Sequence, residues 1–173
     1  MIMAIEVRVA RPDEYDDAGS VTAAAYREFF EPDDDDLPYL DRIADIRGRA
    51  DRTTILVAVE GGRIVGSLTL ELDGRVGDWG DDPPLDPGEA HIRMLGVAPA
   101  ARARGVGGAL MRDAEARARA AGKTHVTLNT TLRMVAGQRM YERLGYVRGA
   151  DHVFPDGFVL LSYSKELSAD GST

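Results

Sequence analysis

The chain contains no cysteine, which excludes disulfide bonds, thiolate metal ligands and a cysteine nucleophile. It also lacks any run approaching the roughly 20 apolar residues of a membrane-spanning helix, and its N-terminus lacks the charged-then-apolar pattern of a secretion signal. These absences predict a soluble, cytoplasmic protein with no membrane partner.

Histidine is scarce, and His91, His125 and His152 lie too far apart to show the spacing of metal ligands, so we expect no metal site. Acidic residues outnumber basic ones by 29 to 21, which gives a formal net charge of −8. This charge disfavours nucleic acid as a partner, because phosphates attract basic surfaces, and favours a cationic partner. A solvated acidic surface would give the same balance. The acid is concentrated over residues 31–36 and 78–89.

The length of 173 residues suits one domain that buries a sizeable core. No repeat or shift of composition divides the chain, so we predict a single domain over residues 1–167 and a disordered tail over 168–173. Arginine and alanine are abundant while Lys123 and Lys165 are the only lysines, a bias that favours a GC-rich bacterial genome.

The spacing of apolar residues predicts both strands and helices. We expect strands over residues 5–10, 54–59, 63–72, 90–97, 124–129, 146–152 and 158–165, and helices over 13–30, 37–50, 105–121 and 134–144. Gly122 and Gly145 should end two of the helices, and residues 73–88 form a long loop of a kind that is often functional. Strand pairs that flank a strand–helix–strand unit imply an α/β (α+β) fold with a mixed sheet.

The most informative segment is a glycine-rich helix start. Gly105, Gly107 and Gly108 lie where the first backbone N–H groups of a helix have no partner inside it. Glycine lets a phosphate approach these groups, and the helix dipole is positive at this end. Arg102 and Arg104 add charged donors beside them. The pattern predicts a diphosphate site.

Two common phosphate motifs are excluded by their spacing. A P-loop requires a lysine directly after its glycines, and none follows here. A dinucleotide-binding fingerprint requires three glycines directly after a strand and an acidic residue about 20 positions on. Leu110 occupies the last glycine position, and the next strand ends in Leu128-Asn129-Thr130 without a carboxylate.

Residues 95–107 read Leu-Gly-Val-Ala-Pro-Ala-Ala-Arg-Ala-Arg-Gly-Val-Gly. This segment resembles the acetyl-CoA motif of the GNAT superfamily of N-acetyltransferases, Leu-x-Val-x-Pro followed by Arg-x-x-Gly-x-Gly. Residues 140–146 resemble the second signature of the family, a helix that ends in an aromatic residue, Leu and Gly. The pattern of elements matches over residues 53–165, and residues 1–50 match only loosely.

The resemblance implies a six- or seven-stranded mixed sheet, splayed between the fourth and fifth strands, with acetyl-CoA as the acyl donor in the gap. The strand backbone would pair with the pantetheine arm around a bulge at Gly96, and the amides of the helix start would bind the pyrophosphate. The implied cofactor-binding residues are Leu95, Gly96, Val97, Arg102, Arg104, Gly105, Val106, Gly107, Gly108 and Ala109.

Tyr141 aligns with the tyrosine of the family that acts as general acid to the departing thiolate. A phenol with a pKa near 10 is matched to a thiolate with a pKa near 8.5. Simple packing of the ring on its helix is the alternative. The family often carries Asn and Ala where this chain has Met134 and Gly137, so Asn129 could supply the missing contact to the cofactor.

Two residues are candidates for the base. His91 lies eleven residues before Arg102, where histone-modifying relatives place a glutamate, and a neutral imidazole with a pKa near 6.5 could take a proton at pH 7. Glu89, on the same strand face, is the rival. Either could equally be a solvated residue at a strand end, with water relaying the proton.

We therefore expect an acetyl-CoA-dependent N-acetyltransferase that acts by direct transfer to an amine, because no cysteine is present to form an acetyl-enzyme. The acidic balance favours a small cationic acceptor, such as a polyamine or an amino-sugar. Acetylation of a protein N-terminus or lysine stays open, and so does a non-catalytic acyl-CoA sensor, although Tyr141 argues against it. The sequence does not name the acceptor, and a homodimer is possible.

Overall fold

The computed structural model describes residues 3–33, 35, 37–77 and 82–168. The strands are β1 (Ile5–Val9), β2 (Thr54–Glu60), β3 (Arg63–Glu71), β4 (Glu89–Val97), β5 (His125–Thr131), β6 (Val147–Arg148), β7 (His152–Val153) and β8 (Val159–Glu166). The helices are α1 (Tyr15–Arg27), α2 (Pro38–Ala44), α3 (Val106–Ala120) and α4 (Val135–Arg143), with 3₁₀ turns at Pro12–Glu14 and Pro99–Ala101. Most of the predicted tail, and residues 78–81 of the acidic loop, lie outside the described residues. Within the described part, no helix is both long and apolar enough to cross a bilayer.

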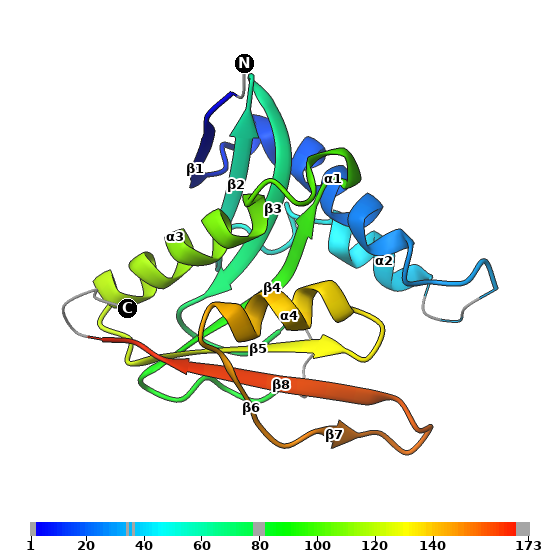
Figure 1. Cartoon of the computed structure of the whole chain (residues 1–173), viewed down its shortest axis with the longest axis vertical. Coiled ribbons are helices and arrows are strands. Elements are labelled where there is room, and N and C mark those ends of the chain that lie inside the picture. Colours follow the sequence, from blue (N-terminus) through cyan, green and yellow to red (C-terminus); the bar gives the residue numbers. More distant parts are fainter. Residues whose placement is uncertain (1–2, 34, 36, 78–81, 169–173) are drawn as a thin grey trace.

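The strands form one mixed sheet in the order β1-β2-β3-β4-β5-β8-β6, with β7 also beside β8 (Figure 1). Strands β4 and β5 are parallel, and the other described pairs are antiparallel. The α/β mixed sheet is confirmed, but it has eight described strands rather than six or seven. The strand predicted over 146–152 divides into β6 and β7. Three residues lie between Arg148 and His152, whereas only two lie between their partners Tyr163 and Leu160 on β8, so one residue bulges out.

Side-chain alternation along β2 sends residues to two cores. Leu56 and Ala58 pack in the cluster that includes Leu110 of α3, whereas Ile55 and Val57 pack with Ala18 of α1. Helices α3 and α4 cover one face of the sheet, and α1 and α2 cover the other (Figure 1).

Helix α2 ends at Ala44 and is therefore shorter than the helix predicted over residues 37–50. The Arg49 guanidinium, which is 2% exposed, donates hydrogen bonds to the carbonyl oxygens of Arg42, Ile43 and Asp45. It thereby binds the last carbonyls of the helix and folds the following chain back over them. Helices α3 and α4 end as predicted, with Gly122 and Gly145 at positive φ.

Candidate active site

Strands β4 and β5 separate part of the way along their length. Their pairing runs from Glu89 opposite His125 to Ile92 opposite Leu128 and stops there. Past this point β4 stays paired with β3, and β5 stays paired with β8. The edge of residues 93–97 that faces β5 therefore has no ladder partner on that side among the described residues, which suits an extended chain inserted between the strands. Predicted residues Leu95, Gly96 and Val97 lie on this segment, and the splay is where the resemblance placed it.

A bulge interrupts this segment one residue before the predicted position. Met94 and Leu95 together oppose the single residue Leu68 of β3, and Met94 has a φ of 54°. The prediction that the bulge lies at Gly96 is therefore wrong. Gly96 instead allows α1 to approach β4, because a Cβ there would lie 3.1 Å from the Cα of Thr22.

The N-terminus of α3 is open to an anion. Ala103 and Gly105 have φ values of 61° and 82°, and the Ala109 N–H donates to the Gly105 carbonyl at 3.0 Å. The N–H groups of residues 105–108 precede that first helical bond, and no side chain of the described part caps this end. The predicted residues Val106, Gly107 and Gly108 form this first turn. A pyrophosphate fits such a terminus, where amides and dipole both attract negative charge.

The two predicted arginines are engaged by carboxylates. Arg102 forms an ion pair with Glu28 and donates to the Ala25 carbonyl at 3.4 Å. Arg104 donates two hydrogen bonds of 2.9 Å to the carboxylate of Glu60. A phosphate role for either side chain stays a prediction, and it would require these pairs to be shared or exchanged.

Tyr141 lies on α4 and is only 8% exposed. Its ring centre is 6.1 Å from that of Tyr146 and 5.9 Å from that of Tyr163. Burial, with a smaller contribution from Tyr163, raises the pKa of Tyr141 to about 12. The phenol is therefore protonated at neutral pH and can donate to a thiolate, but the close pKa match expected from the sequence is not present. Tyr26 of α1, which the sequence analysis missed, is an electrostatic neighbour of Tyr141, and burial raises its pKa.

A pocket of about 270 Å³ lies on the sheet face opposite α3 and α4. Thr127 and Asn129 of β5 line it, and they alternate with Val126 and Leu128, which pack in the core beneath those helices. The other polar lining residues of the described part are Glu89, His91, Ser162, Tyr163 and Ser164, and Val76 and Pro83 of the long loop also line the pocket. Asn129 accepts a hydrogen bond from the Ser162 hydroxyl at 3.3 Å, so its side chain lies on the pocket face, and its cofactor role stays untested.

The two base candidates belong to one hydrogen-bonded chain. The Thr127 hydroxyl lies 2.8 Å from Nδ1 of His91 and donates to Oε1 of Glu89 at 2.5 Å. The β4–β5 register produces this arrangement, because it places Thr127 directly opposite His91. Nothing in the sequence pointed to Thr127, because a threonine is ordinary in any strand.

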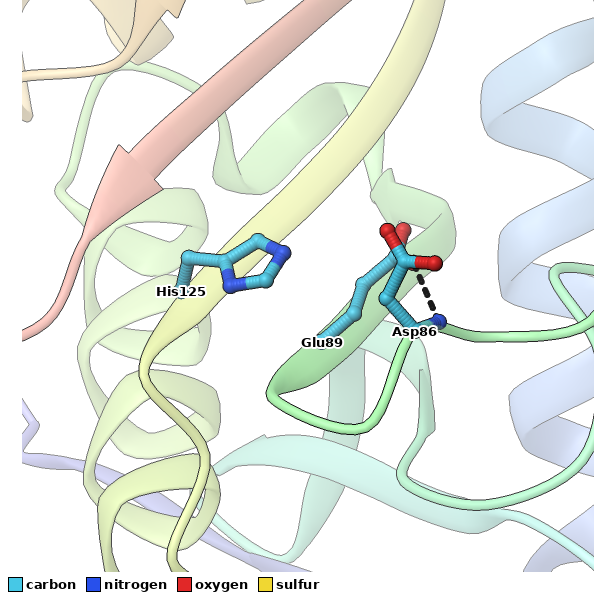
Figure 2. A group of neighbouring side chains, drawn as sticks. All are labelled: Asp86, Glu89 and His125. Carbon is cyan, nitrogen blue, oxygen red and sulfur yellow. Dashed lines mark hydrogen bonds between the residues drawn. The ribbon is translucent and has the colours of Figure 1, made fainter.

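The end of this hydrogen-bonded chain at Glu89 lies near the protein surface, beside the exposed residue Asp86. Glu89 accepts a hydrogen bond from the backbone N–H of Asp86 at 3.0 Å, and the His125 ring points toward both carboxylates (Figure 2). The ligand atoms of Asp86, Glu89 and His125 lie within 4.8 Å of one another, so a cation could bridge them. Both oxygens of Glu89 already accept hydrogen bonds, however, and these bonds account for its position without an ion.

His91 is neutral at neutral pH. Its side chain is 3% exposed, and burial, together with the charge of Arg93, lowers its pKa to about 4. The pKa near 6.5 that was expected for His91 from the sequence is therefore wrong. Arg93 itself donates to the buried Glu71 carboxylate at 2.7 Å and 2.9 Å, a pair that the sequence analysis also missed.

The low pKa of His91 predicts a loss of stability in acid. Between pH 6.5 and 4 the unfolded chain binds a proton that folded His91 excludes, so the free energy of unfolding falls as the pH drops through this range. The expected loss from this group is about 2 kcal/mol between pH 7.5 and pH 5. Urea unfolding of the wild type and of His91→Gln at both pH values measures it, and the variant should lose less. An equal pH dependence in both proteins would contradict the assignment.

Comparison with known proteins agrees with this geometry. The acetyltransferase (GNAT) family profile matches residues 20–146. No curated protein matches the chain. Among solved structures, the chain is similar to a protein from Desulfovibrio desulfuricans described as a GNAT-family acetyltransferase, with 20% identity, a TM-score of 0.70 and coverage of 94% of this chain and 99% of that one.

Two further structures share the fold. The yncA protein from Salmonella typhimurium, described as an acetyltransferase and solved with acetyl-CoA, has 20% identity and a TM-score of 0.66 over 95% of each chain. The ribosomal-protein-S18-alanine N-acetyltransferase from Escherichia coli has 14% identity and a TM-score of 0.69 over 95% of each chain. Members of the matched family use acetyl-CoA. Since the family profile spans well over half of the sequence, this chain belongs to the GNAT family of acetyltransferases.

Proposed function

We propose that the protein transfers an acetyl group directly from acetyl-CoA to the amino group of a small cationic molecule. The observation that carries this proposal is the splay of β4 from β5. Tyr141 and the open N-terminus of α3 lie on one face of the sheet, and the polar pocket lies on the other. A thioester held in the splay and an amine held in the pocket would approach each other from the two faces.

Acetyl-CoA supplies an acetyl group activated as a thioester, and residues of the chain supply the remaining functions. The unpaired edge of β4 orients the extended arm of the donor, and Nε2 of His91 takes up the proton that the amine nitrogen loses. A base with a low pKa suffices for this, because the nitrogen becomes far more acidic once it bonds to the acetyl carbon. The Tyr141 hydroxyl donates to the departing thiolate.

The pocket favours a small, positively charged acceptor. Its volume of about 270 Å³ suits a small molecule, and Glu89 is the one carboxylate among the described residues that line it. The net charge of −8 would attract a cation from a distance. The hydroxyl groups of Thr127, Ser162 and Ser164 can bond to acceptor hydroxyls, which favours an amino-sugar over a polyamine.

Free thiol released from acetyl-CoA, measured with a panel of amino-sugars, polyamines and peptides, tests this proposal. We expect turnover with a small amine, and mass spectrometry should find the N-acetylated product. Turnover with peptides alone would instead assign a protein acetyltransferase. Tight CoA binding without turnover of any amine would assign an acyl-CoA sensor.

A further inference from the structure

The hydrogen bonds around Thr127 determine where the proton of His91 lies. A hydroxyl has a single proton, and Thr127 donates it to Oε1 of Glu89 at 2.5 Å. The Thr127 oxygen can then only accept from Nδ1 of His91, which lies 2.8 Å away. Nδ1 therefore carries the imidazole proton, and Nε2 keeps a free electron pair.

Glu89 forms the end of this hydrogen-bonded chain that is farthest from His91, and it is held in place there. Its second oxygen accepts the backbone N–H of Asp86 at 3.0 Å (Figure 2). The side chain is 9% exposed, and the strand register fixes it opposite His125. A carboxylate bound by two donors is poorly placed to move into the pocket as a base, but it is well placed to orient the Thr127 hydroxyl.

We propose that Thr127 and Glu89 are positioning residues that present Nε2 of His91 to the acceptor amine, an inference that rests on the proposed function. The amine N–H bond breaks, the Nε2–H bond of His91 forms, and the electron pair of the broken bond stays on nitrogen. The Nδ1–H and Thr127 O–H bonds remain intact. The Glu89 carboxylate stabilises the resulting imidazolium through the polarised hydroxyl, and the proton then passes from Nε2 to water.

The tautomer of His91 in the free protein gives a test that needs no acceptor. The chain has only 3 histidines, so the ¹⁵N signals of His91 can be assigned from the spectrum of His91→Gln. We expect the Nδ1–H tautomer in the wild type and in Thr127→Ser, which keeps the hydroxyl. In Thr127→Val, which keeps the shape but lacks the hydroxyl, the Nε2–H tautomer should appear. Either a wild type in the Nε2–H form or an unchanged tautomer in Thr127→Val would overturn the proposal.

Kinetics with an active acceptor provides the second test. Thr127→Val should lower kcat about 10- to 100-fold with little change in the KM for acetyl-CoA, and Thr127→Ser should restore most of the activity. Glu89→Gln keeps a hydrogen-bond acceptor but removes the charge, so it should keep the tautomer while lowering kcat. Full activity in Thr127→Val would overturn the positioning role. Absence of turnover in the wild type would instead overturn the proposed function.

Discussion

Replacing Gly107 by Asp is expected to weaken acetyl-CoA binding by at least about 100-fold, which corresponds to about 2.7 kcal/mol. The new carboxylate would lie in the first turn of α3, where it repels a pyrophosphate and competes with it for the free amides. The fold should survive, because an acidic residue is favourable in the first turn of a helix. A Cβ at this position would lie 2.9 Å from Sδ of Met140, the end of a flexible side chain that can shift.

Calorimetric titration with CoA measures the effect, and two controls separate its causes. Gly107→Ala adds the same Cβ without charge, so it should lose much less affinity than Gly107→Asp. Acetyl-pantetheine lacks the pyrophosphate, and its use as a donor should be much less affected by the charge. A folded Gly107→Asp protein with wild-type affinity for CoA would show that this helix start does not bind the phosphates.

Replacing Tyr141 by Phe should lower kcat about 10- to 1000-fold while the KM for acetyl-CoA changes little. The substitution keeps the ring that packs between Tyr146 and Tyr163 and removes only the proton offered to the thiolate. The hydroxyl has no hydrogen-bond partner among the described residues, so the free energy of unfolding should also change little.

Tyr146→Phe is the matched control for this experiment. It removes the hydroxyl of the neighbouring ring that does not line the pocket, which donates to Glu115 at 3.2 Å, and it should leave kcat nearly unchanged. Pre-steady-state measurement of the first turnover isolates the transfer step from product release. A normal first-turnover rate in Tyr141→Phe would reduce Tyr141 to a packing residue.

The features that the sequence determined by itself are local ones. The glycines after β4 set the start of α3, and Gly122 and Gly145 set the ends of α3 and α4, because each requirement is met within a few residues of the chain. Alternation of apolar residues likewise identified the long strands. The family motif was also readable, since its residues are contiguous.

The tertiary structure decided the features that depend on distant segments. Helix α2 ends early because a buried Arg49 binds its carbonyl groups, and the pKa of His91 is low because other elements exclude water from it. Thr127 is 36 residues from His91 and 38 from Glu89, and only the parallel register of β4 and β5 unites them. The sequence thus established the acetyl-CoA motif, whereas the relation between its two base candidates arose from strand pairing, which no local pattern specifies.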